Sequence, residues 1–146
     1  AKSLKPQNVP KMMGAPVTAI VAQDMEFWKE LPFTFPHEDR RHLFEGKPDY
    51  VRDTADRNAT MQGTYFMIAA RAVGLDVGAM SGFSNKIVDE EFFAGTTLKS
   101  NFLCNITRTA TRFRIWIVVV GCNICQIKND TAFINITITA STSTTE

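Results

Sequence analysis

The stretch Gly74–Phe83 reads Gly-Leu-Asp-Val-Gly-Ala-Met-Ser-Gly-Phe and connects two helical patterns of the chain. Its glycines, Gly74, Gly78 and Gly82, allow backbone conformations and close approaches that side chains would block. Consecutive backbone N–H groups in such a turn, beside a helix start, can bind a planar or anionic ligand. Taken alone, the glycines favour an ordinary helix-to-strand connection that ends in a helix capped by Ser84.

The pattern before this stretch predicts a long helix from Pro48 to Gly74, with Pro48 at its first position and Gly74 as its terminating residue. Apolar side chains recur on one face at helical spacing, and others occupy the rest of the second half of the helix. Such a helix is buried on most sides. Two environments explain this burial equally well: a partner subunit, or the central core of a monomer.

The apolar, β-branched run Pro16–Ala22 predicts a buried strand, and the apolar residues within Leu98–Ile106 predict a second one. A short helix is expected at Asn85–Phe93. Ile87, Val88 and Phe92 would form the inward face of that helix. Residues 1–13 predict a loop and one helical turn, with Asn8 at a capping position. Residues 23–46 are aromatic, proline-rich and without a clear period, so we expect short helical pieces and a loop of the kind that forms substrate lids.

Composition limits the classes of protein that this chain resembles. Its 146 residues suffice for one domain with a core, and 45% hydrophobic and 21% charged residues are globular values. A net charge of +1 without a basic run gives no indication of nucleic-acid binding, and no apolar run is long enough to span a membrane. Three cysteines in a chain that begins without a recognisable export signal indicate a reducing, cytoplasmic location.

The character of the sequence changes near Thr107. Residues 107–146 contain nine threonines, against seven in the preceding 106 residues, and only two acidic residues. The segment Thr131–Thr145 carries no charge and has low complexity. We therefore treat residues 1–106 as the domain and residues 107–146 as an aberrant tail.

Two clusters contain residue types that carry chemistry, but their spacing favours structural roles. His37 and His42 flank acidic residues in a highly charged run that matches no metal-ligand pattern and is best interpreted as a solvated loop. Cys122-Asn-Ile-Cys125 has the spacing of a redox or half-zinc motif without a second ligand pair. We predict no metal site and identify no catalytic residue from the sequence.

Residues 1–106 resemble the flavin-dependent nitroreductase superfamily, and within it the malonic semialdehyde reductase branch. The resemblance is carried by an ordered set of motifs: Asn8-Val-Pro-Lys11, Ala15–Val21, Leu31-Pro32, Phe35-Pro-His37, Arg57-Asn58, Met61-Gln62, Ala69–Phe83, Val88–Phe92 and Leu98–Ile106. It implies an α+β fold, a three-layer α/β/α sandwich with a central sheet and a long buried dimer-core helix, incomplete in this chain.

The same resemblance implies a function and a site. It implies a homodimer, formed through the helix around Met61–Val73, that binds FMN at the subunit interface and uses NAD(P)H as reductant. Asn8 and Lys11 match the family's contact to the pyrimidine side of the flavin, where a cation stabilises negative charge. Met80, Ser81, Gly82 and Phe83 match the loop lying against the isoalloxazine ring. The excursion at residues 27–44 matches the variable segment near the substrate mouth.

The chain also departs from the family pattern. The N-terminal helices that grip the FMN phosphate have no counterpart, and after Ile106 the expected Gly-Tyr-Gly-Asp is replaced by Thr-Arg-Thr-Ala-Thr-Arg. We interpret the tail as the product of a frameshift. Three functions remain: reduction of a small aldehyde such as malonic semialdehyde to 3-hydroxypropanoate, reduction of nitro compounds or quinones, or a non-catalytic fragment that dimerises without retaining flavin.

Overall fold

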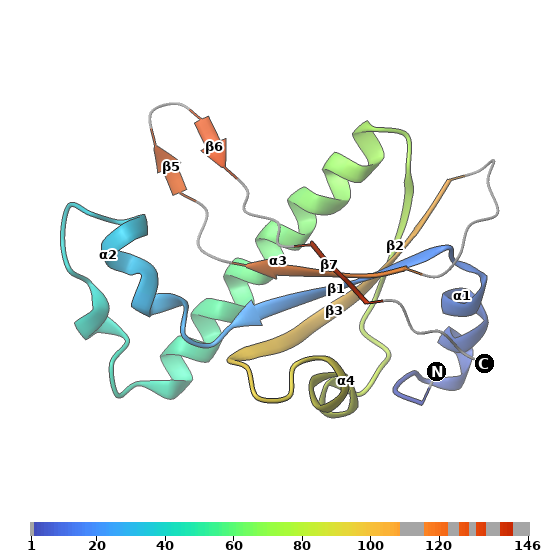
Figure 1. The fold of residues 1–146 in the computed structure, drawn as a ribbon, viewed down its shortest axis with the longest axis horizontal. Coiled ribbons are helices and arrows are strands. Elements are labelled where there is room, and N and C mark those ends of the chain that lie inside the picture. Colours follow the sequence, from blue (N-terminus) through green and yellow to red (C-terminus); the bar gives the residue numbers. More distant parts are fainter. Residues whose placement is uncertain (1, 109–115, 123–125, 129–130, 134–137, 142–146) are drawn as a thin grey trace.

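A five-stranded mixed sheet forms the middle layer of the computed structural model, which describes residues 2–108, 116–122, 126–128, 131–133 and 138–141 (Figure 1). The strand order is β2-β3-β1-β4-β7. Strands β2 and β3 are antiparallel, as are β3 and β1, whereas β1 and β4 are parallel. The bounds are β1 Val17–Asp24, β2 Asp76–Met80, β3 Leu98–Thr107, β4 Trp116–Cys122 and β7 Ile138–Ser141.

Strand β1 is buried on both faces, which explains its continuous apolar sequence. Ala19 and Val21 pack on one side together with Cys104 of β3. Ile20 and Ala22 point to the other side because side chains alternate along a strand. Both strands predicted from the sequence are therefore confirmed.

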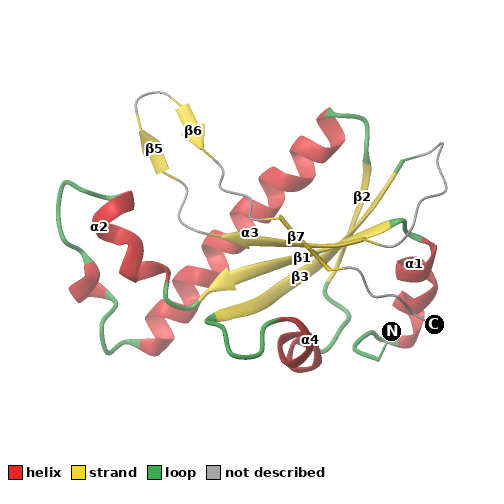
Figure 2. Ribbon diagram, viewed as in Figure 1, coloured by secondary structure: helices red, strands yellow, loops and turns green. Residues whose placement is uncertain are grey.

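The first helical layer is α3, Pro48–Ala72, whose 25 residues pack across one face of the sheet (Figure 2). Pro48 lies in its first turn, and Gly74 follows its end with a φ of 81°, both as predicted. Small buried residues on the side of α3 that is turned inward, Ala59 and Gly63, let the helix approach the sheet closely.

The opposite side of α3 is exposed, so the prediction of burial on most sides is wrong for the single chain. Met61, Tyr65 and Ile68 are 52%, 64% and 58% exposed. Within this chain, α3 therefore borders the core and does not lie at its centre. A partner subunit on this face stays a prediction.

The second helical layer contains α1, Val9–Gly14, preceded by the 3-10 turn η1, Pro6–Asn8, and α4, Asn85–Phe92. Val88 of α4 is buried against Ile20 and Leu103, as expected from the sequence. Ile87 and Phe92 were expected inward as well, yet they are 40% and 37% exposed, so that Val88 alone of the three is buried. Two helical layers around a sheet match the predicted α/β/α arrangement.

The excursion between β1 and α3 folds into short helical pieces, as predicted: η2 Phe27–Glu30, α2 Leu31–Thr34 and η3 Arg41–Leu43. It has its own small core, in which Phe27, Leu31 and Phe44 pack against Val51 and Ala55 of α3. The rings of Phe27 and Phe44 meet edge to face at 5.1 Å.

Beyond Thr107 the backbone continues into the same sheet. Strand β4 pairs with β1 from Val17↔Trp116 to Gln23↔Cys122, and β7 pairs with β4. Strands β5, Gln126–Lys128, and β6, Thr131–Phe133, form a separate two-stranded sheet. The frameshift stays a prediction, and the CxxC motif falls largely on residues 123–125, outside the described residues. Among the described helices, none has the length and apolarity needed to cross a membrane.

Candidate functional site

The Gly-rich stretch is mostly strand, because β2 covers Asp76–Met80, and the interpretation as a turn is wrong for residues 78–80. Gly78 pairs with Asn105 and Met80 with Leu103, so the backbone extends the sheet beside β3. Neither Gly78 nor Gly82 has a positive φ. The edge of β3 offers hydrogen-bond partners that a free turn lacks, and this tertiary contact decides the conformation. The connecting loop is therefore confined to residues 81–84.

This short loop is held by the N-terminal segment, which lies against it. The N–H of Lys5 donates to the Gly82 carbonyl at 2.9 Å, and the N–H of Ser84 donates to the Ser3 carbonyl at 2.7 Å. Leu4 and Phe83 form the isolated bridge between these two bonds. Main-chain hydrogen bonds therefore join residues 3–5 to residues 82–84.

Asn8 adds a side-chain contact to the same carbonyl. Its Nδ2 donates to the Gly82 oxygen at 3.1 Å, across 74 positions of sequence. Asn8 occupies the capping position of α1, as predicted, but its side chain makes no capping hydrogen bond because it is engaged with Gly82. Ser84 likewise precedes α4 without capping it through its side chain.

The requirement for glycine at position 82 follows from this contact. A Cβ atom at Gly82 would lie 2.3 Å from Asn8 Nδ2 and 3.5 Å from Lys5 Cδ. Glycine is therefore needed at position 82 because the Asn8 side chain approaches its Cα closely, and not because of a positive φ.

The other predicted site residues have different environments. Met80 is buried in the core, and its sulfur accepts a hydrogen bond from Asn105 Nδ2 at 3.7 Å, so only its backbone could face a ligand. Phe83 packs at the edge of the same core. Ser81 and Lys11 are exposed, and Lys11 makes no ion pair within the described part of the chain. Of the predicted site residues, Asn8 and Gly82 are therefore in contact, Lys11 and Ser81 are accessible to a ligand, and the Met80 side chain is buried away from the site.

The expected lid lies at the far end of β1 from α1 (Figure 1). The eight residues of β1 separate the two ends by about 23 Å. His37 and His42 belong to this distant end, where His37 packs on Phe35 and His42 Nδ1 lies 3.0 Å from the Asp39 carbonyl. The excursion therefore does not lie against α1 in the same chain.

Among the described residues, the carboxyl and the thiol whose pKa is shifted, Asp39 and Cys104, are not among the predicted site residues. Burial raises the pKa of the Cys104 thiol, which keeps it protonated and unreactive. Hydrogen bonds from Arg41 lower the pKa of Asp39 to about 2, so this exposed carboxyl is ionised at neutral pH.

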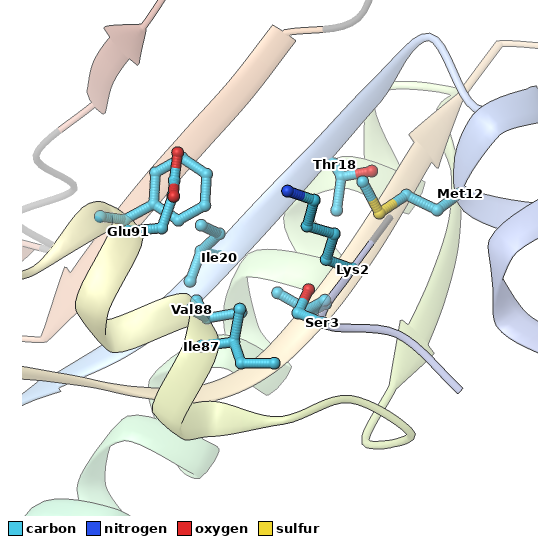
Figure 3. A pocket seen from close by; sticks show the side chains of 10 residues that line it. Lys2, Ser3, Met12, Thr18, Ile20, Ile87, Val88 and Glu91 are labelled. Carbon is cyan, nitrogen blue, oxygen red and sulfur yellow. The ribbon is translucent and has the colours of Figure 1, made fainter. Parts of the chain in front are cut away.

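A cavity of about 460 Å³ lies beside the site, on the α4 side of the sheet, and sequence reasoning missed it (Figure 3). Its walls are mainly apolar and include Met12, Ile20, Ile87 and Phe92. None of the six predicted site residues lines it. The helical pattern assigned Ile87 and Phe92 to the core, whereas both are partly exposed and line this cavity.

No protein-family model matches the sequence. Among solved structures, a nitroreductase family protein from Streptococcus pneumoniae TIGR4 is similar, with a TM-score of 0.57, 18% identity and coverage of 77% of this chain and 64% of that chain. A structure described as an NAD(P)H:FMN oxidoreductase, from Staphylococcus epidermidis ATCC 12228, gives a TM-score of 0.45 and 13% identity, with coverage of 65% and 53%. The chain thus spans less than two thirds of either structure. It has the α+β fold of the nitroreductases.

Proposed function

We propose that this chain forms part of an FMN-dependent NAD(P)H oxidoreductase, with the flavin ring held where Asn8 meets Gly82. The observation that carries the proposal is the hydrogen bond from Asn8 Nδ2 to the Gly82 carbonyl. It joins the two segments that the family resemblance assigns to the ring, although 74 positions separate them. The nitroreductase-like fold supports the same proposal.

The polar groups at this position fit the pyrimidine edge of a flavin. Because Nδ2 of Asn8 is engaged with Gly82, its Oδ1 is left as an acceptor for a ring N–H. Lys11 lies one turn further along α1 and is an exposed cation. A cation there would favour the negative charge that a flavin gains on reduction. Backbone groups of Ser81 and Gly82 would complete the contact.

When bound, FMN would take hydride from NAD(P)H and pass it to a substrate. We propose a small aldehyde such as malonic semialdehyde as the substrate, and nitro compounds or quinones as the alternative. The name of the pneumococcal structure, a nitroreductase family protein, favours including that alternative. A fragment that dimerises without retaining flavin is the non-catalytic alternative.

We further propose that the chain works as a homodimer through α3. The exposed Met61, Tyr65 and Ile68 form an apolar stripe on the face turned away from the sheet. In a dimer, the excursion of one subunit could approach the Asn8–Gly82 site of its partner, which the distance along β1 prevents within one chain.

Flavin binding is tested by titrating the purified chain with FMN and following the quenching of flavin fluorescence. Lys11→Gln should weaken binding, whereas Lys86→Gln, a matched loss of an exposed lysine on α4, should leave it unchanged. Asn8→Ala should weaken binding further, because it also releases the Gly82 loop. Circular dichroism of each variant separates lost binding from lost folding.

Turnover is tested with FMN and NADH or NADPH, followed by oxidation of the nicotinamide in the presence of malonic semialdehyde, a nitroaromatic compound or a quinone. Quenching at micromolar FMN together with oxidation supports the oxidoreductase. A folded chain that neither quenches flavin nor oxidises NAD(P)H is the non-catalytic fragment and overturns the proposal. Light scattering tests the dimer separately: Ile68→Asp should yield monomers, and a monomeric unmodified chain would rule the dimer out.

A further inference from the structure

The cavity beside α4 has the size and lining of a small-molecule site. Its volume of about 460 Å³ falls within the range of ligand pockets in proteins, roughly 300–1,000 Å³. Ile20 of β1 and Leu103 of β3 form its floor, and Ile87 and Phe92 of α4 form one wall. Water in such an apolar space gains few hydrogen bonds, so an apolar ligand group would displace it favourably.

The polar groups of the cavity are few and unevenly placed. The Lys2 side chain lies between Ile20 and Thr18 with its ammonium toward the cavity, and Ser3 lies beside it (Figure 3). Glu91 lies across the cavity next to the wall formed by α4. Neither Lys2 nor Glu91 has an ion-pair partner among the residues that the structure describes. Thr18 Oγ1 already donates to Asn105 Oδ1 at 2.8 Å, so its hydroxyl proton is engaged.

We propose that this cavity binds a small arylalkyl carboxylate. The ring would lie on Ile20 and Leu103 and contact Phe92, while the carboxylate would accept hydrogen bonds from the Lys2 ammonium and the Ser3 hydroxyl. Lys2 and Ser3 place two donors among the lining residues, and Glu91 places one carboxylate across the cavity from Lys2. This asymmetry selects an anion at the Lys2 side, and Glu91 disfavours a second negative charge.

This site is separate from the proposed flavin site, since none of Asn8, Lys11 or residues 80–83 lines the cavity. The proposal of a carboxylate site can therefore be tested independently of the proposal of a flavin site. Binding of the carboxylate in the absence of FMN would support this one even if the chain retained no flavin.

The test uses three ligands that share one ring and differ in charge: phenylacetate, phenylethanol and phenethylamine. Each is titrated into the full chain by isothermal calorimetry, with ligand-observed NMR to detect weak binding. Phenylacetate should bind most tightly and phenethylamine least. Lys2→Gln should weaken phenylacetate about two- to fivefold, the range for a partly exposed ion pair, with no effect on phenylethanol. Glu91→Gln should tighten phenylacetate by a similar factor.

Matched controls keep the result specific. Lys86→Gln and Glu90→Gln remove an exposed pair from the same helix and should change no affinity. Ile87→Ala trims the apolar wall at a half-exposed position and should weaken all three ligands alike. Equal affinity of the three ligands, or an unchanged phenylacetate affinity in folded Lys2→Gln, would refute the proposal, as would the absence of binding at millimolar ligand.

Discussion

Gly63 in the middle of α3 provides a sharp test of how the helix packs on the sheet. A Cβ atom at this position would lie 2.6 Å from Cζ and 2.7 Å from Cε1 of the Phe102 ring, and 3.1 Å from Val21 Cγ1. Favourable contacts between carbon atoms lie near 3.5–4.0 Å. Gly63→Ala would therefore require the Phe102 ring to move by about 1 Å, as judged from that contact distance.

Two opposing effects decide the sign of this substitution. Alanine is favoured over glycine inside a helix by about 1 kcal/mol. Overpacking of a close-packed interior costs about 1–3 kcal/mol. Because the clash involves two ring atoms and a strand residue, we expect the cost to win, with a net destabilisation of about 1 kcal/mol.

The assay is urea unfolding followed by far-ultraviolet circular dichroism, for Gly63→Ala alone and in combination with Phe102→Leu. Removing the ring should remove the clash, so that Gly63→Ala becomes stabilising by about 1 kcal/mol in the Phe102→Leu background. The double-mutant cycle should yield a coupling free energy of about 2 kcal/mol, within the range for residues in contact.

Gly14→Ala is the matched control, since nothing lies within 4 Å of a Cβ atom at the end of α1. It should be neutral or slightly stabilising. If Gly63→Ala stabilised the chain to the same extent as Gly14→Ala, or kept the same sign in both Phe102 backgrounds, the close packing of α3 on β1 and β3 would be incorrect.

Three further predictions concern single positions. Gly74→Ala should lower the free energy of unfolding by about 1 kcal/mol in urea melts, because a φ of 81° is unfavourable for alanine. The Asp39 carboxyl, followed by NMR, should titrate with a pKa of about 2. Its stabilising contact with Arg41 is fully present above the unfolded pKa of about 3.9 and is lost as the pH falls through the pKa of the folded state. Arg41→Gln should raise the pKa of Asp39. With the other two cysteines replaced by serine, Cys104 should react with a thiol reagent only after denaturation.

Much of the architecture was predictable from local pattern. Strand β1 stands out as a nearly continuous apolar run because both of its faces are buried, and β3 is marked by the apolar residues Phe102, Leu103 and Cys104. The limits of α3 could be predicted because Pro48 and Gly74 act through their own backbone geometry, which depends little on the rest of the fold.

The candidate site was predictable only as two separate segments. The sequence indicates Asn8 and Gly82 through family resemblance, but it does not indicate that the Asn8 side chain leaves its own helix to reach the Gly82 carbonyl. Met80 illustrates the opposite outcome, since the same motif assigns it to the ring contact and the fold buries its side chain in the core. The cavity lined by Ile87 and Phe92 was not predictable, because helical periodicity cannot tell how much of an apolar face the sheet covers.

The sequence by itself determined the elements whose signals are local: the two buried strands, the limits of α3 and the short helical pieces of the excursion. Only the tertiary structure decided that residues 76–80 form a strand, because their backbone groups are satisfied by β3, which follows about twenty residues later. It also decided that Met61, Tyr65 and Ile68 remain exposed in the single chain. A residue's type determines its preference for burial, whereas the neighbour that satisfies this preference depends on how distant segments meet.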